Sequence, residues 1–501
     1  MNATLKNKEL QKQLVKYFPH DPTIDQLVLI KALSVFCLDI NPHQIFVMQG
    51  YAGTGKTSMI RTIIKALPSF NKKTVLLAPT GRAAKVISAY TKRKAYTIHK
   101  HIYYPKVKAG SLSFDLQKNK ASNTIYIVDE ASMIGNQTDN AFGGNALLDD
   151  LMRFVDQGVH CKVMLIGDIA QLPPVGLTMS PALMPEELQM RYFKEVHHVE
   201  LKEVVRQAAE SGVLSNATSL RELLDVKQNR YQPIFDLYPD VIRLSEKHDL
   251  EEALNDAYSS KSLEDSVVVL RSNKRANVYN QEIRNRILWY EDEITGGDHL
   301  MVVKNNYFCL PNESKAGFIA NGDQIVVKRI STIEDRHGFR FAKAEVNLVD
   351  YPDEPEFETL LLLDCIYVDK PSMSYEDSNR LYKSVEREYA YISTKYKRFQ
   401  AIKADPYFNA LQVKFAYAIT CHKAQGGQWK NVFIEQGYLP EPKVEEEYLR
   451  WLYTAFTRAI DTVYLIGFKP DFFKDEEEKS ELDIEYKECK QCNASLPNTT
   501  G

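Results

Sequence analysis

Residues 50–57 are Gly-Tyr-Ala-Gly-Thr-Gly-Lys-Thr, the residue pattern of a phosphate-binding loop. An apolar run precedes the pattern and a helix-compatible run follows it, as this motif requires. Glycines let backbone N–H groups turn inward and cradle phosphates at a helix N-terminus. The pattern predicts that Lys56 reaches the β- and γ-phosphates of ATP and that Thr57 supplies a hydroxyl to Mg²⁺. The residues expected to bind the nucleotide are Gly50, Ala52, Gly53, Thr54, Gly55, Lys56, Thr57 and Ser58.

Two carboxylates, Asp129 and Glu130, follow another apolar run. We expect Asp129 to hold Mg²⁺ through water and Glu130 to orient and deprotonate the attacking water. Two acids at a strand end are common on protein surfaces, but their place after a phosphate-binding loop favours the catalytic interpretation. A third apolar run leads to Gln171, which we expect to contact the γ-phosphate. The prolines that follow, Pro173 and Pro174, also stiffen that loop.

These residues require a scaffold of buried parallel strands, which appear in a sequence as short continuous apolar runs. Helix-compatible segments separate many of the runs, so the chain is predicted to form two α/β lobes. The candidate residues follow strand ends, where ligands bind in open α/β sheets. The predicted strands lie at 44–50, 74–80, 124–130 and 162–168 in the first lobe and at 266–273, 414–420, 431–437 and 462–468 in the second.

Two segments interrupt this alternation. Residues 101–123 alternate β-forming residues around a Lys-Ala-Gly-Ser turn, which predicts a hairpin projecting from the first lobe. Residues 292–405 begin with strand-like runs separated by Gly, Asn and Asp, as in a small β-barrel. From 378 to 404 the insert is charged and helical, with apolar residues three or four apart on one face. We interpret that face as a packing surface.

The overall composition limits the classes of partner. The 501 residues include 63 basic and 66 acidic side chains, so a path for nucleic acid must be a local feature. Seven scattered cysteines, no signal-peptide pattern and no apolar run near the ~20 residues that span a bilayer indicate a soluble cytoplasmic protein without membrane contact. The acidic tail, 471–501, is expected to be flexible. Its single Cys489/Cys492 pair does not favour a zinc site, which needs four ligands.

The ordered motifs resemble the superfamily 1B helicases, especially the RecD-like and Dda-like branch with its Pif-type relatives. The resemblance extends from Gln26 to Phe468. It rests on the segments 50–57, 78–85, 97–99, 129–132, 167–175, 203–207, 321–323, 420–426 and 453–459. It implies two RecA-like (P-loop NTPase) lobes, a pin hairpin in lobe one, and an SH3-like β insert with a helical extension in lobe two. The implied domains are lobe 1A at 1–200, lobe 2A at 201–291 and 406–470, and domain 2B at 292–405.

The resemblance also implies roles that spacing alone does not give. Gln26 is similar to an adenine-reading glutamine, and Arg206 and Arg458 to two arginines that lobe two points at the γ-phosphate. Arginines delivered across a cleft would make hydrolysis depend on closure of the lobes. The residues implied to contact DNA are Pro79, Thr80, Thr97, His99, Tyr103, Tyr104, Asn305, Tyr307, Thr420, His422 and Lys423. The aromatic residues of the hairpin either stack on unpaired bases or pack the hairpin onto lobe one.

The resulting expectation is an ATP- and Mg²⁺-dependent helicase that moves 5′-to-3′ on single-stranded DNA, acts on forked or tailed duplexes, and works as a monomer. The direction comes from the resemblance alone. An RNA helicase of the same superfamily, and a strand-binding ATPase subunit that uses ATP as a switch, remain alternatives; a nuclease has little support. The chain departs from RecD-like members at Gly427-Gln428-Trp429, where a small residue and then Glu are usual. The resemblance therefore does not predict which contact these three residues make.

Overall fold

The structure is a computed structural model. It describes residues 3–108, 111–138, 144–205, 211–226, 228–259, 263–310, 314, 316, 318–351, 354–439, 441 and 443–474. Arg206 and most of the acidic tail, with Cys489 and Cys492, lie outside the described residues. Within the described ranges, no helix combines the length and the apolar character needed to cross a bilayer.

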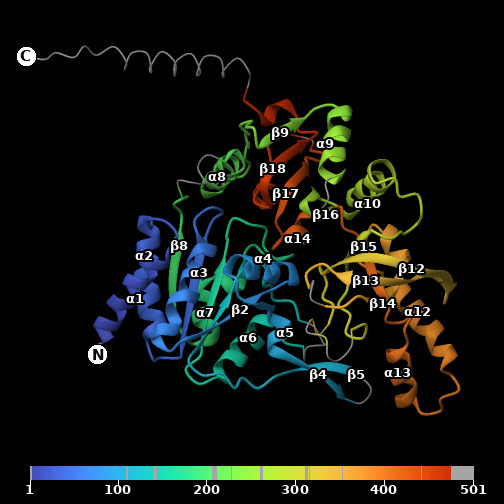
Figure 1. The fold of residues 1–501 in the computed structure, drawn as a ribbon, viewed down its shortest axis with the longest axis horizontal. Helices are drawn as coiled ribbons and strands as arrows, with labels where there is room; N and C mark the ends of the chain where they lie inside the picture. Colours follow the sequence, from blue (N-terminus) through green and yellow to red (C-terminus); the bar gives the residue numbers. More distant parts are fainter. Residues whose placement is uncertain are drawn as a thin grey trace, which may run out of the picture.

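Lobe one is a six-stranded parallel sheet with the order β3-β2-β6-β7-β1-β8 (Figure 1). Its strands are β1 (Gln44–Gly50), β2 (Lys73–Ala78), β3 (Ala95–Thr97), β6 (Thr124–Val128), β7 (Lys162–Gly167) and β8 (Glu195–Leu201). Every residue of β1 is buried, and alternate residues join different cores: Phe46 packs with one cluster and Val47 with the other. The sheet is therefore covered on both faces, as a continuous apolar strand requires.

Helices supply the two covers of this sheet. One cover consists of α1 (Ala3–Tyr17), α2 (Ile24–Leu38), α3 (Lys56–Ala66) and α4 (Gly81–Thr91), and the other of α5 (Ile98–Ile102), α6 (Leu147–Asp156) and α7 (Pro185–Tyr192). Local sequence sets where several of them begin. The side chain of Thr23 accepts a hydrogen bond from the backbone of Gln26 and so caps α2, and Thr80 caps α4 in the same way.

Lobe two is a five-stranded parallel sheet with the order β16-β10-β17-β18-β9. Its strands are β9 (Val241–Leu244), β10 (Ser266–Leu270), β16 (Ala418–Thr420), β17 (Trp429–Glu435) and β18 (Ala459–Ile466). Its helices are α8 (Gly212–Asp225), α9 (Lys247–Ser259), α10 (Asn273–Glu282), α14 (Cys421–Ala424) and α15 (Glu446–Phe456). Strand β10 repeats the pattern of β1, because Val267 and Val268 belong to different cores. The predicted two-lobe α/β fold is confirmed.

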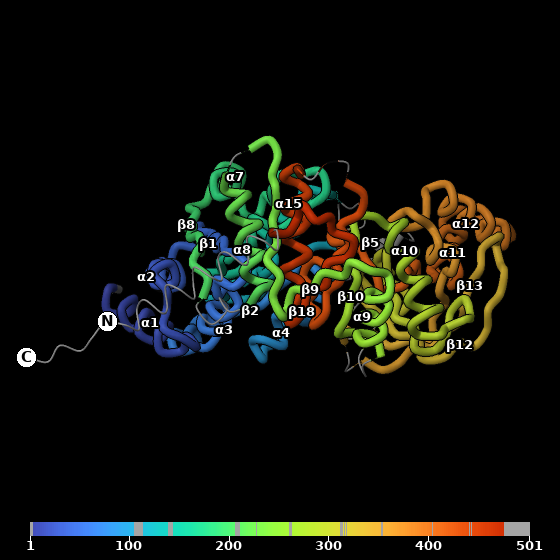
Figure 2. The backbone as a smooth tube through the Cα atoms, turned by 90° about the horizontal axis from the view of Figure 1, so that it is seen from above, coloured from blue at the N-terminus to red at the C-terminus, as the bar shows by residue number. Residues whose placement is uncertain are grey.

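The insert is a closed five-stranded barrel with a helical extension. Its strands are β11 (His299–Val302), β12 (Gln324–Arg336), β13 (Phe339–Leu348), β14 (Phe357–Leu362) and β15 (Leu411–Phe415), and its helices are α11 (Asp364–Tyr367), α12 (Tyr375–Glu388) and α13 (Lys395–Ala404). Seen from above, lobe one, lobe two and the barrel follow one another along the long axis of the molecule (Figure 2). The hairpin of β4 (Tyr103–Lys108) and β5 (Ser111–Leu116) leaves lobe one on the side of the barrel (Figure 1).

Three sequence-based expectations need correction. The run 414–420 is not one strand of lobe two: β15 pairs with β11 and β14 in the barrel, and only β16 joins the second sheet. The barrel therefore continues past residue 405, where we placed its end. The helical segment 378–404 is split between α12 and α13, and its apolar face is only partly a packing surface. Leu381 and Val385 pack against the barrel, whereas Tyr396 is 45% exposed.

Candidate functional site

The phosphate-binding loop joins β1 to α3 at the carboxyl edge of the first sheet. Gly53 and Gly55 have φ angles of 74° and 91°, in the left-handed region that glycine adopts without strain. Lys56, the first residue of α3, donates from Nζ to the carbonyls of Gly50 (2.7 Å) and Tyr51 (2.8 Å). The loop thus aims its cation and the start of α3 at one point, which suits a polyphosphate.

A cavity of about 430 Å³ lies over this loop. Its walls include Lys56, Thr57, Asp129, Glu130 and Gln171, which come from different strand ends of lobe one. These were sequence-predicted site residues, and the fold brings them together. Within the described part of the chain, the carbonyl Oε1 of Gln171 is buried and has no hydrogen-bond partner. A buried acceptor of this kind is costly unless a ligand or water supplies a donor.

The acidic pair is held in an unusual backbone conformation. Glu130 has a φ of 54°, and the N–H of Asp129 donates to Leu77 at 2.9 Å. Burial, and then the charge of Glu130, raise the pKa of Asp129 well above its ordinary value. Oxygen donors from Thr57 and Asp129 fit the hard cation Mg²⁺, which would offset that negative charge.

Gln26 lies under the loop rather than on the cavity wall. Its Oε1 accepts from the N–H of Thr23 (3.0 Å) and its Nε2 donates to the carbonyl of Thr54 (2.9 Å). The side chain is 1% exposed, and a Cβ on Gly55 would approach its Nε2 to 2.7 Å. Gln26 therefore supports the loop and the start of α2; its reading of adenine stays a prediction. The cavity wall on this side includes His20 and Tyr90, which the sequence did not single out.

Lobe two reaches the same cavity through the residues that follow α15. Arg458 lines the cavity, is 3% exposed, and donates from Nε to the carbonyl of Thr454 (3.0 Å) and from Nη1 to that of Gly427 (3.3 Å). The predicted partner arginine, Arg206, falls outside the described residues. One cation of the distal lobe is thus held at the rim of the nucleotide cavity.

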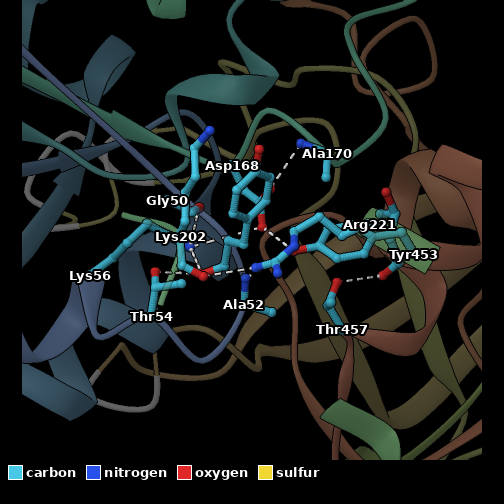
Figure 3. Close-up of polar contacts among 12 residues, drawn as sticks. Gly50, Ala52, Thr54, Lys56, Asp168, Ala170, Lys202, Arg221, Tyr453 and Thr457 are labelled. Atoms are coloured by element: carbon cyan, nitrogen blue, oxygen red, sulfur yellow. Dashed lines mark hydrogen bonds and ion pairs between the residues drawn. The ribbon is translucent and has the colours of Figure 1, made fainter. Parts of the chain in front are cut away.

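Tyr453, which lies on α15, makes a contact that the sequence did not predict. Its hydroxyl donates to Asp168 Oδ2 at 2.7 Å and accepts from the N–H of Ala52 at 2.9 Å (Figure 3). Asp168 directly follows β7. It is 1% exposed, and its carboxylate lies 3.9 Å from Lys56 Nζ. Both residues belong to segments that carry the resemblance, Gly167-Asp168 and Tyr453–Ala459, but neither has a spacing that reveals its partner.

More hydrogen bonds join the lobes beside this contact. The N–H of Leu172 donates to Thr454 Oγ1 (2.8 Å), Gln425 Nε2 donates to the carbonyl of Leu172 (2.6 Å), and Arg450 donates to the carbonyl of Ile169. The loop that carries Gln171 is therefore bonded on both sides to lobe two. Movement of one lobe relative to the other changes the geometry of this loop.

The predicted strand path follows a repeated motif. Thr97-Ile-His99-Lys and Thr420-Cys-His422-Lys have the same pattern, Thr-x-His-Lys. Each threonine ends an edge strand, β3 or β16, and is the N-cap of the next short helix. Pro79 and Thr80 follow the neighbouring strand β2. Loop tips of this kind contact phosphates without reading sequence, and the fold places one on each lobe.

Several basic residues of lobe one in this region contact domain 2B or lobe two. Lys85 donates to the carbonyl of Val349 (2.9 Å), and the Arg82 guanidinium lies 3.9 Å from the centre of the Trp429 ring. Gly427 is required by this packing, because a Cβ there would lie 2.5 Å from the Trp429 ring and 2.7 Å from Arg82 Nε. The departure at 427–429 is thus a contact between the lobes. Lys423 keeps no such partner among the described residues, and burial lowers its pKa to about 8.

The hairpin residues divide into packed and exposed ones. Tyr103 is 6% exposed and its hydroxyl donates to the buried carboxylate of Asp150 (2.8 Å), so we correct its assignment as a base-stacking residue: it fixes the hairpin to lobe one. Tyr104 is 42% exposed. Phe114 packs 4.5 Å from Tyr307 of domain 2B, centre to centre, which leaves Tyr307 in an aromatic cluster rather than at a free surface.

Asn305 is also engaged within its own loop. Its Nδ2 donates to the hydroxyl of Tyr307 (3.0 Å), and its Oδ1 accepts from the N–H of Asn321 (2.7 Å). Contact of Asn305 with DNA stays a prediction. Through the aromatic cluster, domain 2B packs directly against the base of the hairpin.

Comparison with known proteins agrees with this architecture. Residues 38–228 match the AAA domain family, and residues 415–466 match the UvrD-like helicase C-terminal domain. The ATP-dependent RecD2 DNA helicase of Deinococcus radiodurans is 30% identical over 36% of the chain and 22% of its own length. The ATP-dependent DNA helicase dda of Enterobacteria phage T4 is 23% identical over 84% of the chain and 93% of its own length.

The two domain matches and the RecD2 and dda relatives together support a superfamily 1B helicase. An uncharacterised protein of Acanthamoeba polyphaga mimivirus, R530, is 24% identical over 87% of the chain and 98% of its own length. Among solved structures, a Pif1 helicase described at forked duplex DNA aligns over 93% of the chain and 97% of its own, with a TM-score of 0.44 and 17% identity.

Proposed function

We propose that this ATP-hydrolysing DNA helicase translocates 5′-to-3′ on single-stranded DNA and separates duplex strands at the β4–β5 hairpin. The observation that supports it most is the shared nucleotide cavity. Lobe one supplies Lys56, Asp129 and Glu130, while lobe two supplies Arg458 at the rim and the Tyr453 hydroxyl beneath it. A cavity built from two lobes couples its occupancy to their relative position.

The proposed chemistry assigns one task to each group. Lys56 binds the β- and γ-phosphates, Glu130 takes a proton from the attacking water, and Gln171 orients that water through its unpartnered carbonyl. Arg458, joined by Arg206, stabilises charge on the γ-phosphate. Mg²⁺, when held by Thr57 and Asp129, neutralises charge on the phosphate oxygens. Closure places the arginines, so hydrolysis and lobe movement occur together.

We propose that the strand runs across both Thr-x-His-Lys loops, since one lies on each lobe. Relative movement of the lobes then becomes movement along the strand. At the front, the hairpin is anchored by Tyr103 to lobe one and by Phe114 to domain 2B. A rigid projection of this kind is what strand separation needs. The direction of movement rests on the superfamily 1B relationship.

Strand displacement tests the proposal directly. Paired duplexes with a 5′ or a 3′ single-stranded tail are incubated with the protein, with ATP and without it. We expect ATP-dependent displacement of the 5′-tailed duplex. Displacement of only the 3′-tailed duplex contradicts the direction. ATP hydrolysis on DNA without displacement of either duplex supports the second candidate, a strand-binding ATPase switch, and stronger stimulation by an RNA oligomer than by its DNA equivalent supports an RNA helicase.

A further inference from the structure

A second cavity, of about 650 Å³, lies in lobe one away from the nucleotide site. Strands β2 and β6 begin at its wall, with Lys73 and Thr124, whereas the nucleotide loop and the Thr80 cap lie beyond the strands' carboxyl ends. The cavity is therefore at the opposite edge of the sheet, about 20 Å from the carboxyl ends at the ~3.3 Å rise of a strand residue. None of the residues assigned to ATP or to the strand path lines it.

The rim of this cavity is strongly basic. Five cationic side chains line it, and no Asp or Glu appears among its lining residues in the described part of the chain. Within the same part of the chain, none of the five forms an ion pair, although lysines and arginines elsewhere commonly do. The five are Lys72, Lys73, Arg93, Lys118 and Lys120. Like charges gathered without counter-charges repel one another, so the arrangement favours an anionic ligand.

The floor of the cavity is rigid and neutral. His101, Tyr126 and Phe154 form an aromatic cluster with ring centres 5.6–5.7 Å apart. Burial lowers the pKa of His101, so its imidazole is neutral at pH 7. Asn119 ties the segment after the hairpin to α6, since its Nδ2 donates to the carbonyl of Phe154 (3.0 Å). The charge is thus confined to the rim, where Lys73, Arg93, Lys118 and Lys120 are exposed.

The cavity is part of the base of the hairpin. His101 precedes β4, Gln117 follows β5, and both line the cavity. The backbone N–H of Gln117 donates to the carbonyl of Ile102 (2.8 Å), and the Gln117 side chain donates to the backbone carbonyl of His101. These bonds join the two ends of the hairpin. A strand diverted along the six-residue arms of the hairpin reaches the basic rim after about 20 Å.

We propose that this basic cavity binds the backbone phosphates of the DNA arm that the hairpin diverts, as a second nucleic-acid site separate from the translocation path. The proposal rests on the proposed function of the hairpin. The exposed rim suits a backbone that crosses the cavity, because extended lysine side chains can follow successive phosphates. Such a contact holds the separated arm away from the path and opposes its return.

The test compares Lys73→Gln/Lys118→Gln/Lys120→Gln with a control of equal charge change, Lys8→Gln/Lys12→Gln/Lys65→Gln, whose lysines are exposed on α1 and α3. Binding to a forked DNA and to a single-stranded oligomer is measured by anisotropy at several salt concentrations. If all three rim lysines contact phosphates of the diverted single strand, the salt slope for the fork falls by about 2.1 in the first variant only. Wild-type affinity then falls about 18-fold more between 50 and 200 mM salt than that of the variant.

The remaining outcomes are distinct. An unchanged fork slope in the rim variant, or an equal loss on the single-stranded oligomer, overturns the proposal. Binding of inorganic tripolyphosphate to the wild type but not to the rim variant, with equal fork slopes, shows a small-anion site and also overturns it. ATPase stimulation by the single-stranded oligomer is measured in parallel. If the wild type lacks that stimulation, the proposed motor function fails; if only the fork effect is absent, the basic cavity alone is reassigned.

Discussion

The hydroxyl of Tyr453 lies 2.7 Å from the carboxylate Oδ2 of Asp168, and the two residues belong to different lobes. The same hydroxyl accepts from the N–H of Ala52 in the phosphate-binding loop, while Asp168 accepts from the N–H of Ala170 (2.9 Å) ahead of Gln171. One side chain of lobe two therefore contacts both the phosphate-binding loop and the segment that leads to Gln171. Tyr453 is 1% exposed, so water does not replace this contact while the lobes stay together.

Tyr453→Phe is expected to lower kcat of DNA-stimulated ATP hydrolysis by about tenfold, with a smaller change in KM for ATP. Removing the hydroxyl leaves the Asp168 carboxylate short of a donor, at a cost of about 1–3 kcal/mol, and 1.4 kcal/mol corresponds to tenfold in rate. Steady-state kinetics give both constants. Tyr448→Phe is the matched control, because it removes a hydroxyl bond of the same helix to Gln436 within lobe two (3.1 Å). Equal losses in both variants would show a general packing effect.

Lys56→Ala is expected to reduce ATP turnover by about 10²–10³-fold, the effect of removing one well-placed donor to a developing charge. Affinity for a single-stranded oligomer should remain within a few-fold of the wild type, since Lys56 faces the nucleotide cavity. Phosphate release and anisotropy measure the two properties. Lys65→Ala, at an exposed position of the same helix, should leave both unchanged. Normal turnover in Lys56→Ala would remove the catalytic assignment of the cavity.

Single-strand affinity is expected to depend on pH through Lys423. Burial, and then the nearby charge of Lys414, lower its pKa to about 8. A lowered lysine pKa means that the charge is present below about pH 8 and is lost above it, so phosphate binding weakens as the pH rises. If the bound phosphate keeps the lysine charged, affinity should fall about tenfold between pH 7 and 9. Lys423→Arg should flatten this profile, whereas Lys430→Arg, at an exposed site, should retain it.

Tyr104→Ala is expected to slow duplex unwinding more than it slows translocation on single-stranded DNA. Tyr104 is the exposed tyrosine at the base of the hairpin, and an aromatic face accepts any unpaired base, with about 1–3 kcal/mol per stacked base. Strand displacement measures unwinding, and release of a protein block from a single strand measures translocation. Equal reduction of both rates would remove the stacking role. Tyr103→Phe tests the anchor instead, since it keeps the ring and removes the bond to Asp150.

Gly427→Ala is expected to lower the midpoint of thermal unfolding by about 1–3 °C. The added Cβ would meet the Trp429 ring at 2.5 Å, and overpacking of this kind costs about 1–3 kcal/mol. In a Trp429→Ala background the same change should cost much less, because the clashing ring is gone. Scanning calorimetry of the four proteins of this cycle measures the difference. A penalty that is the same in both backgrounds would mean that the contact with Arg82, and not the Trp429 ring, requires glycine at 427.

The sequence by itself determined the features that neighbouring residues produce. The phosphate-binding loop needs only its own glycines, Lys56 and Thr57, and β1 occupies residues 44–50 as its apolar run predicts. The acids after β6 and the two-lobe fold followed from the same local signals. The carboxyl ends of parallel strands lie at one edge of a sheet. Most of the lobe-one residues that we assigned to nucleotide binding therefore line one cavity, and the others lie beneath it.

Only the tertiary structure decided which distant surfaces meet. Ala52 and Tyr453 are 401 positions apart, and no periodicity relates them. Tyr103 and Tyr104 are adjacent and chemically identical, yet one is buried on Asp150 and the other is exposed, because successive side chains of a strand point to opposite faces. Residues 415–419 are apolar without a break, so the division of the run 414–420 between barrel and lobe two depends on which strands offer hydrogen-bond partners. Hydrophobic burial selects the faces that pack, but the partner of each face is set by the whole fold.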